Sequence, residues 1–84
     1  MKSLLVTADD FGLCKQVNDA VCLLYDKGIV SRTSFIVNTD HFDQSVDDLL
    51  KRPGLETGIH LNLTDGGPVL APAEVRTLVN RDGA

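Results

Sequence analysis

The sequence predicts an α/β fold in which three strands and two helices alternate in the order β-α-β-α-β. Three short apolar or β-branched segments are separated by two segments with the 3.6-residue periodicity of amphipathic helices. Glycine- and proline-containing turns divide these segments, and strands that alternate with helices form parallel sheets through right-handed crossovers. Three strands leave a sheet edge uncovered. We therefore expect residues 1–84 to be the amino-terminal part of a single, larger α/β domain.

The first strand and the first helix are predicted from apolar spacing. Residues 4–8 form a continuous apolar run, which is typical of a strand buried on both faces, and residues 9–12 should follow it as a loop. Residues 15–27 should form a helix, which Gly28 would end with a left-handed C-cap. Its apolar stripe should contain Val17, Ala20, Val21, Leu23 and Leu24.

The second half of the pattern repeats the first. Residues 33–37 are rich in β-branched and aromatic side chains and predict a second strand. Asp40 is then expected to cap a helix over residues 41–51 that presents Phe42, Val46, Leu49 and Leu50 as its apolar face. Residues 56–64 predict a third strand, with His60, Asn62 and Thr64 on the face opposite to Ile59, Leu61 and Leu63.

Composition excludes several classes of function. The net charge is −4 and no basic cluster is present, so we expect no nucleic-acid partner. No apolar run approaches the ~20 residues that span a bilayer, and the first residues do not resemble a signal peptide, so we expect no membrane partner. Cys14 and Cys22 have no metal-site spacing and suggest no disulfide, which favours a cytoplasmic protein. Cys22 should be a small buried hydrophobic residue.

Candidate site residues follow the predicted strands. Active sites of parallel α/β folds lie at the carboxyl ends of the strands. Asp9 and Asp10 end the first strand, Asn38 ends the second, and His60 lies toward the end of the third. One carboxylate and an imidazole can bind a metal that activates water, while the other carboxylate serves as a base. These positions therefore indicate a hydrolytic metal centre.

Other interpretations of the same residues stay open at this point. The acidic pair could simply cap a turn, and a single histidine is more often a hydrogen-bonded rim residue than a ligand. His41 fits solvated surface. A phosphoacceptor receiver domain also begins with an acidic pair, but it needs an aspartate where this chain has His60 and Asn62. A catalytically inactive, truncated α/β fragment is the remaining alternative.

Three segments resemble signature motifs of the YdjC-like family, whose characterised type is chitooligosaccharide deacetylase. They are residues 7–13 (TADDFGL), residues 28–34 (GIVSRTS) with Val37 and Asn38, and residues 58–64 (GIHLNLT) with residues 67–70 (GPVL). The three matches occur in order across nearly the whole chain. The resemblance implies a distorted (β/α) barrel with parallel strands, of roughly 250 residues.

The resemblance also implies an activity for the full-length protein. Members of this type remove N-acetyl groups from chitooligosaccharides or related N-acetylated sugars with a divalent metal ion, here Mg²⁺ or Zn²⁺. Asp10 and His60 would be metal ligands and Asp9 the general base, and a further histidine would come from a later segment. The partner would be a small-molecule sugar, with a homodimer left open. Residues 1–84 would carry half of the active site and be inactive alone.

Overall fold

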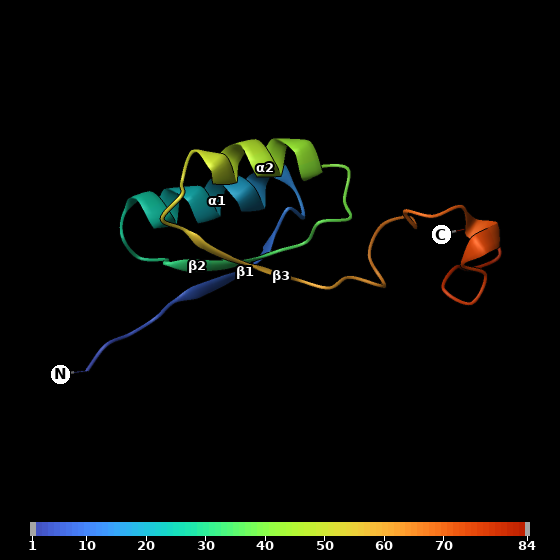
Figure 1. The fold of residues 1–84 in the computed structure, drawn as a ribbon, viewed down its shortest axis with the longest axis horizontal. Coiled ribbons are helices and arrows are strands. Elements are labelled where there is room, and N and C mark those ends of the chain that lie inside the picture. Colours follow the sequence, from blue (N-terminus) through green and yellow to red (C-terminus); the bar gives the residue numbers. More distant parts are fainter. Residues whose placement is uncertain (1, 84) are drawn as a thin grey trace.

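The chain folds into a three-stranded sheet that is covered by helices on one face. The computed structural model describes residues 2–83. A parallel sheet, in the order β1-β2-β3, is formed by β1 (Thr7–Phe11), β2 (Arg32–Phe35) and β3 (Glu56–Ile59). Both α1 (Lys15–Asp26) and α2 (Phe42–Leu50) lie on the same side of this sheet (Figure 1). The predicted β-α-β-α-β order and the parallel sheet are therefore confirmed.

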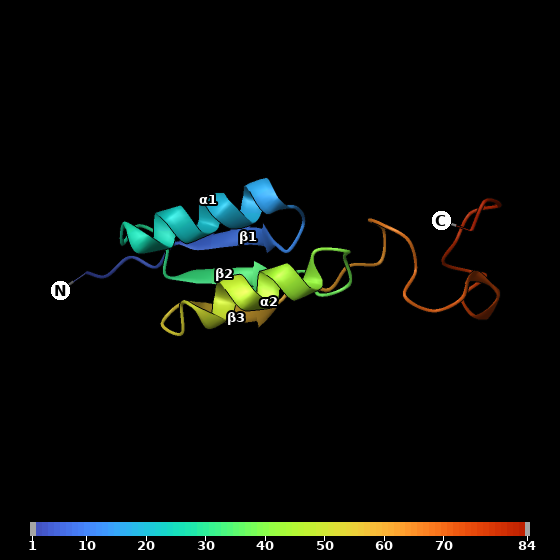
Figure 2. The ribbon, with the colours of Figure 1, turned by 90° about the horizontal axis from the view of Figure 1, so that it is seen from above.

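The segments outside this unit extend away from it. Residues 2–6 lead into β1 from one side, and residues 60–83 continue past β3 to the other (Figures 1 and 2). The second segment contains one short 3₁₀ helix, η1 (Pro72–Glu74). Among residues 2–83 no helix has the length and apolar content needed to cross a bilayer.

The strand order excludes a receiver domain. Strands that are consecutive in sequence are also neighbours in the sheet, and both connecting helices cover one face. This singly wound arrangement is the one found in (β/α) barrels. A receiver domain is doubly wound, with its first strand between the second and third, so that its helices cover both faces. The receiver alternative is therefore wrong.

The first strand lies later in the sequence than predicted and contains a β-bulge. Thr7 pairs with Arg32 and Ala8 with Thr33, but the next pair is Phe11 with Phe35. Two residues of β1 thus stand opposite the single residue between Thr33 and Phe35, which is the pattern of a bulge. The predicted bounds are wrong for residues 4–6, which are not strand, and for residues 9–11, which are strand and not loop, because pairing with β2 fixes the strand. Nor is β1 buried on both faces, since Thr7 and Asp9 are exposed, Ala8 and Asp10 are partly buried, and Phe11 is fully buried.

The other strand boundaries differ from the prediction for the same reason. β2 ends at Phe35 rather than at residue 37, and β3 ends at Ile59 rather than at residue 64. The backbone N–H of His60 still donates to the carbonyl of Phe35, at 2.9 Å, and pairing stops there. The alternating pattern beyond Ile59 therefore continues in exposed chain, where Leu61 and Leu63 are solvent-accessible.

Helix α1 begins and ends close to the predicted positions. Gly28 adopts a left-handed conformation, with φ of +77°. Its N–H donates to the carbonyl of Tyr25, and the N–H of Ile29 donates to that of Leu24, both at 2.9 Å. These two bonds form a Schellman motif, which confirms the predicted glycine C-cap. The predicted stripe is partly wrong, because Ala20, Leu23 and Leu24 are exposed.

Helix α2 is not capped by Asp40. The residue before the helix is His41, and no side chain caps it. The preceding turn is instead organised by Thr39, whose hydroxyl accepts from the N–H of His41 at 3.2 Å and donates to the carbonyl of Gly12 at 2.5 Å. Contrary to the predicted apolar face, Leu50 and Phe42 are exposed, although Phe42 stacks on Phe35.

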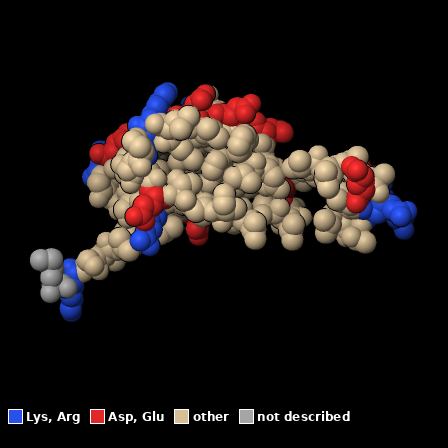
Figure 3. Space-filling view, in the orientation of Figure 1, with Lys and Arg blue, Asp and Glu red and all other residues tan. Residues whose placement is uncertain are grey.

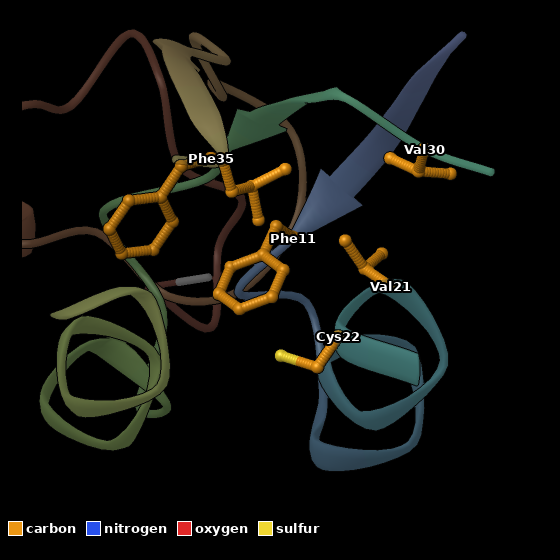
Figure 4. Packing of buried hydrophobic residues seen from close by; sticks show 6 residues of the cluster. Phe11, Val21, Cys22, Val30 and Phe35 are labelled. Atoms are coloured by element: carbon orange, nitrogen blue, oxygen red, sulfur yellow. The ribbon is translucent and has the colours of Figure 1, made fainter. Parts of the chain in front are cut away.

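The apolar core lies between the sheet and the helices (Figure 4). Phe11 and Phe35 meet edge to face, with ring centroids 5.9 Å apart. The cluster is made by Phe11, Val21, Cys22, Val30, Phe35 and Leu55. Burial of Cys22 confirms its predicted role and raises the pKa of its thiol through desolvation. Carboxylates gather on the outer side of the helix layer (Figure 3), as expected of a solvated face.

Candidate active site

The predicted site residues meet where the three strands end. The Nδ1 atom of His60 lies 3.2 Å from Oδ1 of Asp10 and 3.2 Å from Oγ of Ser34. The Ser34 hydroxyl in turn donates to Oδ1 of Asp9 at 3.1 Å. Asp9, Asp10 and His60 come from two different strand ends and converge around a serine of the strand between them. The expectation that strand ends bring them together is confirmed.

The bulge in β1 places both carboxylates near the same histidine. Neighbouring residues of a regular strand point to opposite faces of the sheet. Asp10 departs from that rule because its φ is +71°, in the left-handed region that Asp adopts more readily than most residues. Its backbone N–H donates to the Ser34 hydroxyl at 3.3 Å. A bulge thus redirects a functional side chain at the strand end, where such irregularities are often found in active sites.

A buried polar network fixes the turn that follows the two aspartates. The N–H of Gly12 donates to Oδ1 of Asn18 at 2.7 Å, and the Asn18 amide donates to Oγ of Ser45 at 2.8 Å. Ser45 donates to the carbonyl of His41 at 2.6 Å, so the network joins the turn to both helices. Asn18 is 1% exposed and Ser45 is fully buried. The buried side chains of Asn18 and Ser45 are therefore both hydrogen-bonded, which holds the turn in one position.

Gly12 itself is required by close packing. Its φ is +95°, which disfavours any other residue. A Cβ atom at this position would lie 2.5 Å from the carbonyl oxygen of Ile36 and 2.8 Å from the ring of Phe35. The turn after the acidic pair is therefore pressed directly against β2.

Sequence reasoning placed the contribution of the second strand at Asn38, but the structure shows Ser34 in that position. Asn38 forms a reciprocal amide contact further along, donating to the carbonyl of Asn62 at 3.0 Å and accepting from its side chain at 3.1 Å. The same Asn62 accepts from the N–H of Asp65 and organises the turn after β3. No local sequence pattern marks Ser34, because its place in the site depends on its pairing position on the central strand, opposite the bulge.

The spacing of the donor atoms suits a small divalent cation. Ligands about 2.1 Å from one cation lie about 3.0 Å apart in octahedral and about 3.4 Å apart in tetrahedral geometry. The 3.2 Å between Asp10 Oδ1 and His60 Nδ1 falls between these values. In residues 2–83 no group of three or more His, Cys, Asp or Glu side chains is arranged to hold a metal. Asp10 and His60 therefore fit as two ligands of a site that needs further donors.

The site is open to solvent and lies next to a groove. The side chains of His60 and Asp10 are 37% and 49% exposed, so a ligand can reach both. A groove of about 430 Å³ lies beyond them, lined by Asn38 and Asn62 together with residues 63–70, Val75 and Leu78. Asp9, Asp10 and His60 do not line it. We assign the chemistry to the strand ends, where those groups converge, and not to the groove.

Comparison with known proteins identifies relatives across the whole chain. Residues 3–84 match the family model described as YdjC-like protein. A carbohydrate deacetylase from Thermoanaerobacter pseudethanolicus is 41% identical over 83 residues, which cover 99% of this chain and 33% of the relative. Carbohydrate deacetylase 2 from Listeria innocua is 39% identical over 80 residues, covering 95% of this chain and 31% of the relative.

A solved structure agrees with these relatives. The crystal structure of a protein from Enterococcus faecalis, named for cellobiose-phosphate cleavage, superposes with a TM-score of 0.84 at 28% identity. The superposition covers 94% of this chain and 31% of the other. This chain therefore spans about a third of the length of the relatives that it matches. Because the family model covers all but its first two residues, the chain belongs to the YdjC-like family.

Proposed function

We propose that the full-length protein is a metal-dependent deacetylase that hydrolyses the N-acetyl groups of chitooligosaccharides or related N-acetylated sugars. The observation that carries this proposal is the convergence of Asp9, Asp10 and His60 at the ends of parallel strands, within 3.2 Å of a shared serine or of one another. Relatives named carbohydrate deacetylase support it, at 41% and 39% identity.

Asp10 and His60 are the proposed metal ligands. A carboxylate oxygen and an imidazole nitrogen are donors that suit Zn²⁺ and are compatible with Mg²⁺. Such a cation, when bound, polarises the acetyl carbonyl and lowers the pKa of a bound water molecule. The two residues also hold each other in place, because Oδ1 of Asp10 and Nδ1 of His60 are already in contact. Little rearrangement is then needed to present both donors to one point.

Asp9 is the proposed general base. Its carboxylate contacts the Ser34 hydroxyl and not His60, so it remains available to accept a proton from the attacking water. A carboxylate beside a second carboxylate is tolerated when a cation offsets their repulsion, which divides the pair into one ligand and one base. The remaining ligand and the catalytic acid would come from the two-thirds of the relatives' length that this chain does not span. We expect no turnover from the 84 residues alone.

The assignment of Asp9 is tested by replacing it in the full-length protein. Asp9→Asn should keep its metal, measured by elemental analysis, while acetate release from an N-acetylated oligosaccharide falls by about 10²–10⁴-fold, the usual contribution of a general base. The double variant Asp10→Asn/His60→Gln should lose both the metal and the activity.

Asp43→Asn, on the exposed surface of α2, is the matched control and should change neither quantity. Acetate release retained in Asp9→Asn would refute the base assignment. Metal retained by the double variant would refute the ligand assignment.

The Enterococcus structure adds a second substrate to the same assay. Its name refers to the cleavage of cellobiose phosphate, and its fold matches 94% of this chain. The full-length protein should therefore be offered a chitooligosaccharide and a phosphorylated cellobiose side by side. Acetate release from the first supports deacetylation. Cleavage of the phosphorylated cellobiose without acetate release from the chitooligosaccharide would refute deacetylation. The activity would then be hydrolysis of a glycosidic or phosphate bond.

A further inference from the structure

We propose that Ser34 is a positioning residue that aligns the general base with the metal-binding histidine. This inference rests on the proposed function, because it concerns how Asp9 and His60 are held relative to each other. Ser34 lies on the central strand β2, between the strand that carries the aspartates and the strand that precedes the histidine. Its hydroxyl contacts both sides of the site, at Asp9 and at His60, and so links the proposed base to the histidine.

The hydroxyl of Ser34 uses its full hydrogen-bonding capacity on three site groups. A serine hydroxyl has one hydrogen to donate and two lone pairs that accept. The Asp9 carboxylate can only accept, and the Asp10 backbone N–H can only donate, so the hydroxyl gives its hydrogen to Asp9 at 3.1 Å and accepts from Asp10 at 3.3 Å. The second lone pair faces Nδ1 of His60 at 3.2 Å and accepts from it while Nδ1 carries the ring hydrogen, before a cation takes that place. One hydroxyl thus contacts the Asp9 carboxylate, the Asp10 backbone and the His60 ring.

The position of Ser34 explains why no other group provides these contacts. The bulge sets two residues of β1 opposite Ser34, so the N–H of Asp10 has moved off the regular ladder and bonds to the side chain instead. On its other side Ser34 pairs with Gly58, which has no side chain, and a Cβ added there would meet nothing within 4 Å. The space beside the hydroxyl is therefore open, and the hydroxyl can reach across to His60.

A purely structural role predicts a different outcome from a positioning role. Ser34 lies on the open face of the sheet, where water can replace the hydroxyl as a partner of Asp9 and Asp10. Loss of the hydroxyl should then cost little stability. The orientation of Asp9 relative to His60 would no longer be fixed, however, and residues that orient metal ligands usually change affinity or rate by about 10–100-fold.

The test compares two neighbouring hydroxyls on β2 in the full-length protein. Ser34→Ala removes the contact with the site, and Ser34→Thr keeps the hydroxyl while adding a methyl group to the open side. Thr33→Val is the matched control, because Thr33 is 2% exposed and its hydroxyl donates to the carbonyl of Ala8 at 2.8 Å, on the helix-covered face. Acetate release, Zn²⁺ affinity by calorimetry, and thermal unfolding are measured for each variant.

We expect substitutions at Ser34 to affect activity and substitutions at Thr33 to affect stability. Ser34→Ala should lower kcat by about 10–100-fold, weaken Zn²⁺ binding by up to about tenfold, and leave KM and the unfolding temperature nearly unchanged. Ser34→Thr should restore most of kcat. Thr33→Val should lower the unfolding temperature and leave kcat and Zn²⁺ affinity unchanged.

The outcomes separate this inference from the proposed function. A wild-type protein that deacetylates, with Ser34→Ala equal to it in kcat and in Zn²⁺ affinity, overturns the role of Ser34 and leaves the function standing. If kcat falls in proportion to the unfolding temperature in both Ser34→Ala and Thr33→Val, the effect of Ser34 is structural. That result would also overturn its positioning role. A wild-type protein that neither releases acetate nor binds Zn²⁺ overturns the proposed function and the role of Ser34 together.

Discussion

The two faces of the sheet have opposite chemistry although they are built from the same strands. On the helix-covered face Thr33 and Phe35 of β2 are buried, and Phe35 joins the apolar core. On the open face the alternate residues of the same strand are Arg32 and Ser34, which are polar and accessible. Side chains alternate along a strand, so a four-residue strand can supply both faces.

The open face is itself divided along the strand direction. At the amino-terminal end Arg32 and Glu56, which pair across β2 and β3, form an ion pair at 2.6 Å. At the carboxyl-terminal end Ser34 joins Asp9 and His60. The covered face therefore carries the apolar core, and the open face carries the candidate site. Substitutions on the two faces should separate stability from activity.

The largest effect should come from the covered face. Phe11 is fully buried, packs edge to face against Phe35, and follows the bulge that holds Asp10. Phe11→Ala should lower the free energy of unfolding by about 3–5 kcal/mol, because it leaves a cavity in a small core. Urea denaturation of the full-length protein measures this loss. Phe11→Leu, which keeps most of the apolar volume, should cost less.

Thr7 at the start of the same strand is the control for Phe11, because it is exposed on the open face. Thr7→Ala should change the free energy of unfolding by less than about 0.5 kcal/mol, as surface substitutions usually do. Equal losses for Phe11→Ala and Thr7→Ala would show that the two faces do not differ in their contribution to stability.

An intermediate effect is expected from the buried polar network that joins the turn at Gly12 to the two helices. Asn18→Ala removes the partners of the Gly12 N–H and of the Ser45 hydroxyl, both of which are buried. Unsatisfied buried groups cost about 1–3 kcal/mol, so the free energy of unfolding should fall by that amount in urea denaturation. Ser45→Ala should cost less, since Asn18 then keeps its bond to Gly12.

The two substitutions in this network should not be additive. The loss for Asn18→Ala combined with Ser45→Ala should be smaller than the summed single losses, because both remove the same contact. Additive losses would show that Asn18 and Ser45 stabilise the fold independently, and that the network does not act as a unit.

Much of the fold could be predicted because it depends on local signals. Helix α1 followed from apolar spacing and from Gly28, whose left-handed conformation forms the Schellman motif. Strand boundaries could not be predicted in the same way, since a strand is defined by its partner. Leu4 and Leu5 are apolar yet exposed, because paired residues of β1 begin only at Thr7.

The site, like the fold, could be predicted only where local sequence signals define it. Asp9, Asp10 and His60 have side chains whose chemistry is visible in the sequence, and the rule about strand ends brought them together. Ser34 was missed because its role depends on cross-strand register and on a one-residue bulge, which no local pattern encodes. Asn18 was missed because a polar residue within an amphipathic helix is usually exposed, and here it binds the turn at Gly12.

The smallest effect should come from the ion pair that connects the ends of the two helices. Arg52, just after α2, donates to both carboxylate oxygens of Asp26 at the end of α1, at 3.0 and 2.9 Å, and these bonds lower the pKa of Asp26 below its ordinary value. A carboxyl whose pKa is lower in the folded state stabilises the fold above its unfolded-state pKa, and this contribution disappears as the pH falls through the lowered pKa. Asp26→Asn should therefore lower the urea midpoint slightly near neutral pH. The difference from the wild type should begin to shrink below about pH 4, the ordinary pKa of Asp, and vanish below the lowered pKa. Added salt should also reduce it, since the pair is solvent-exposed. A difference that stays constant with pH would show that Asp26 acts through helix packing and not through its charge.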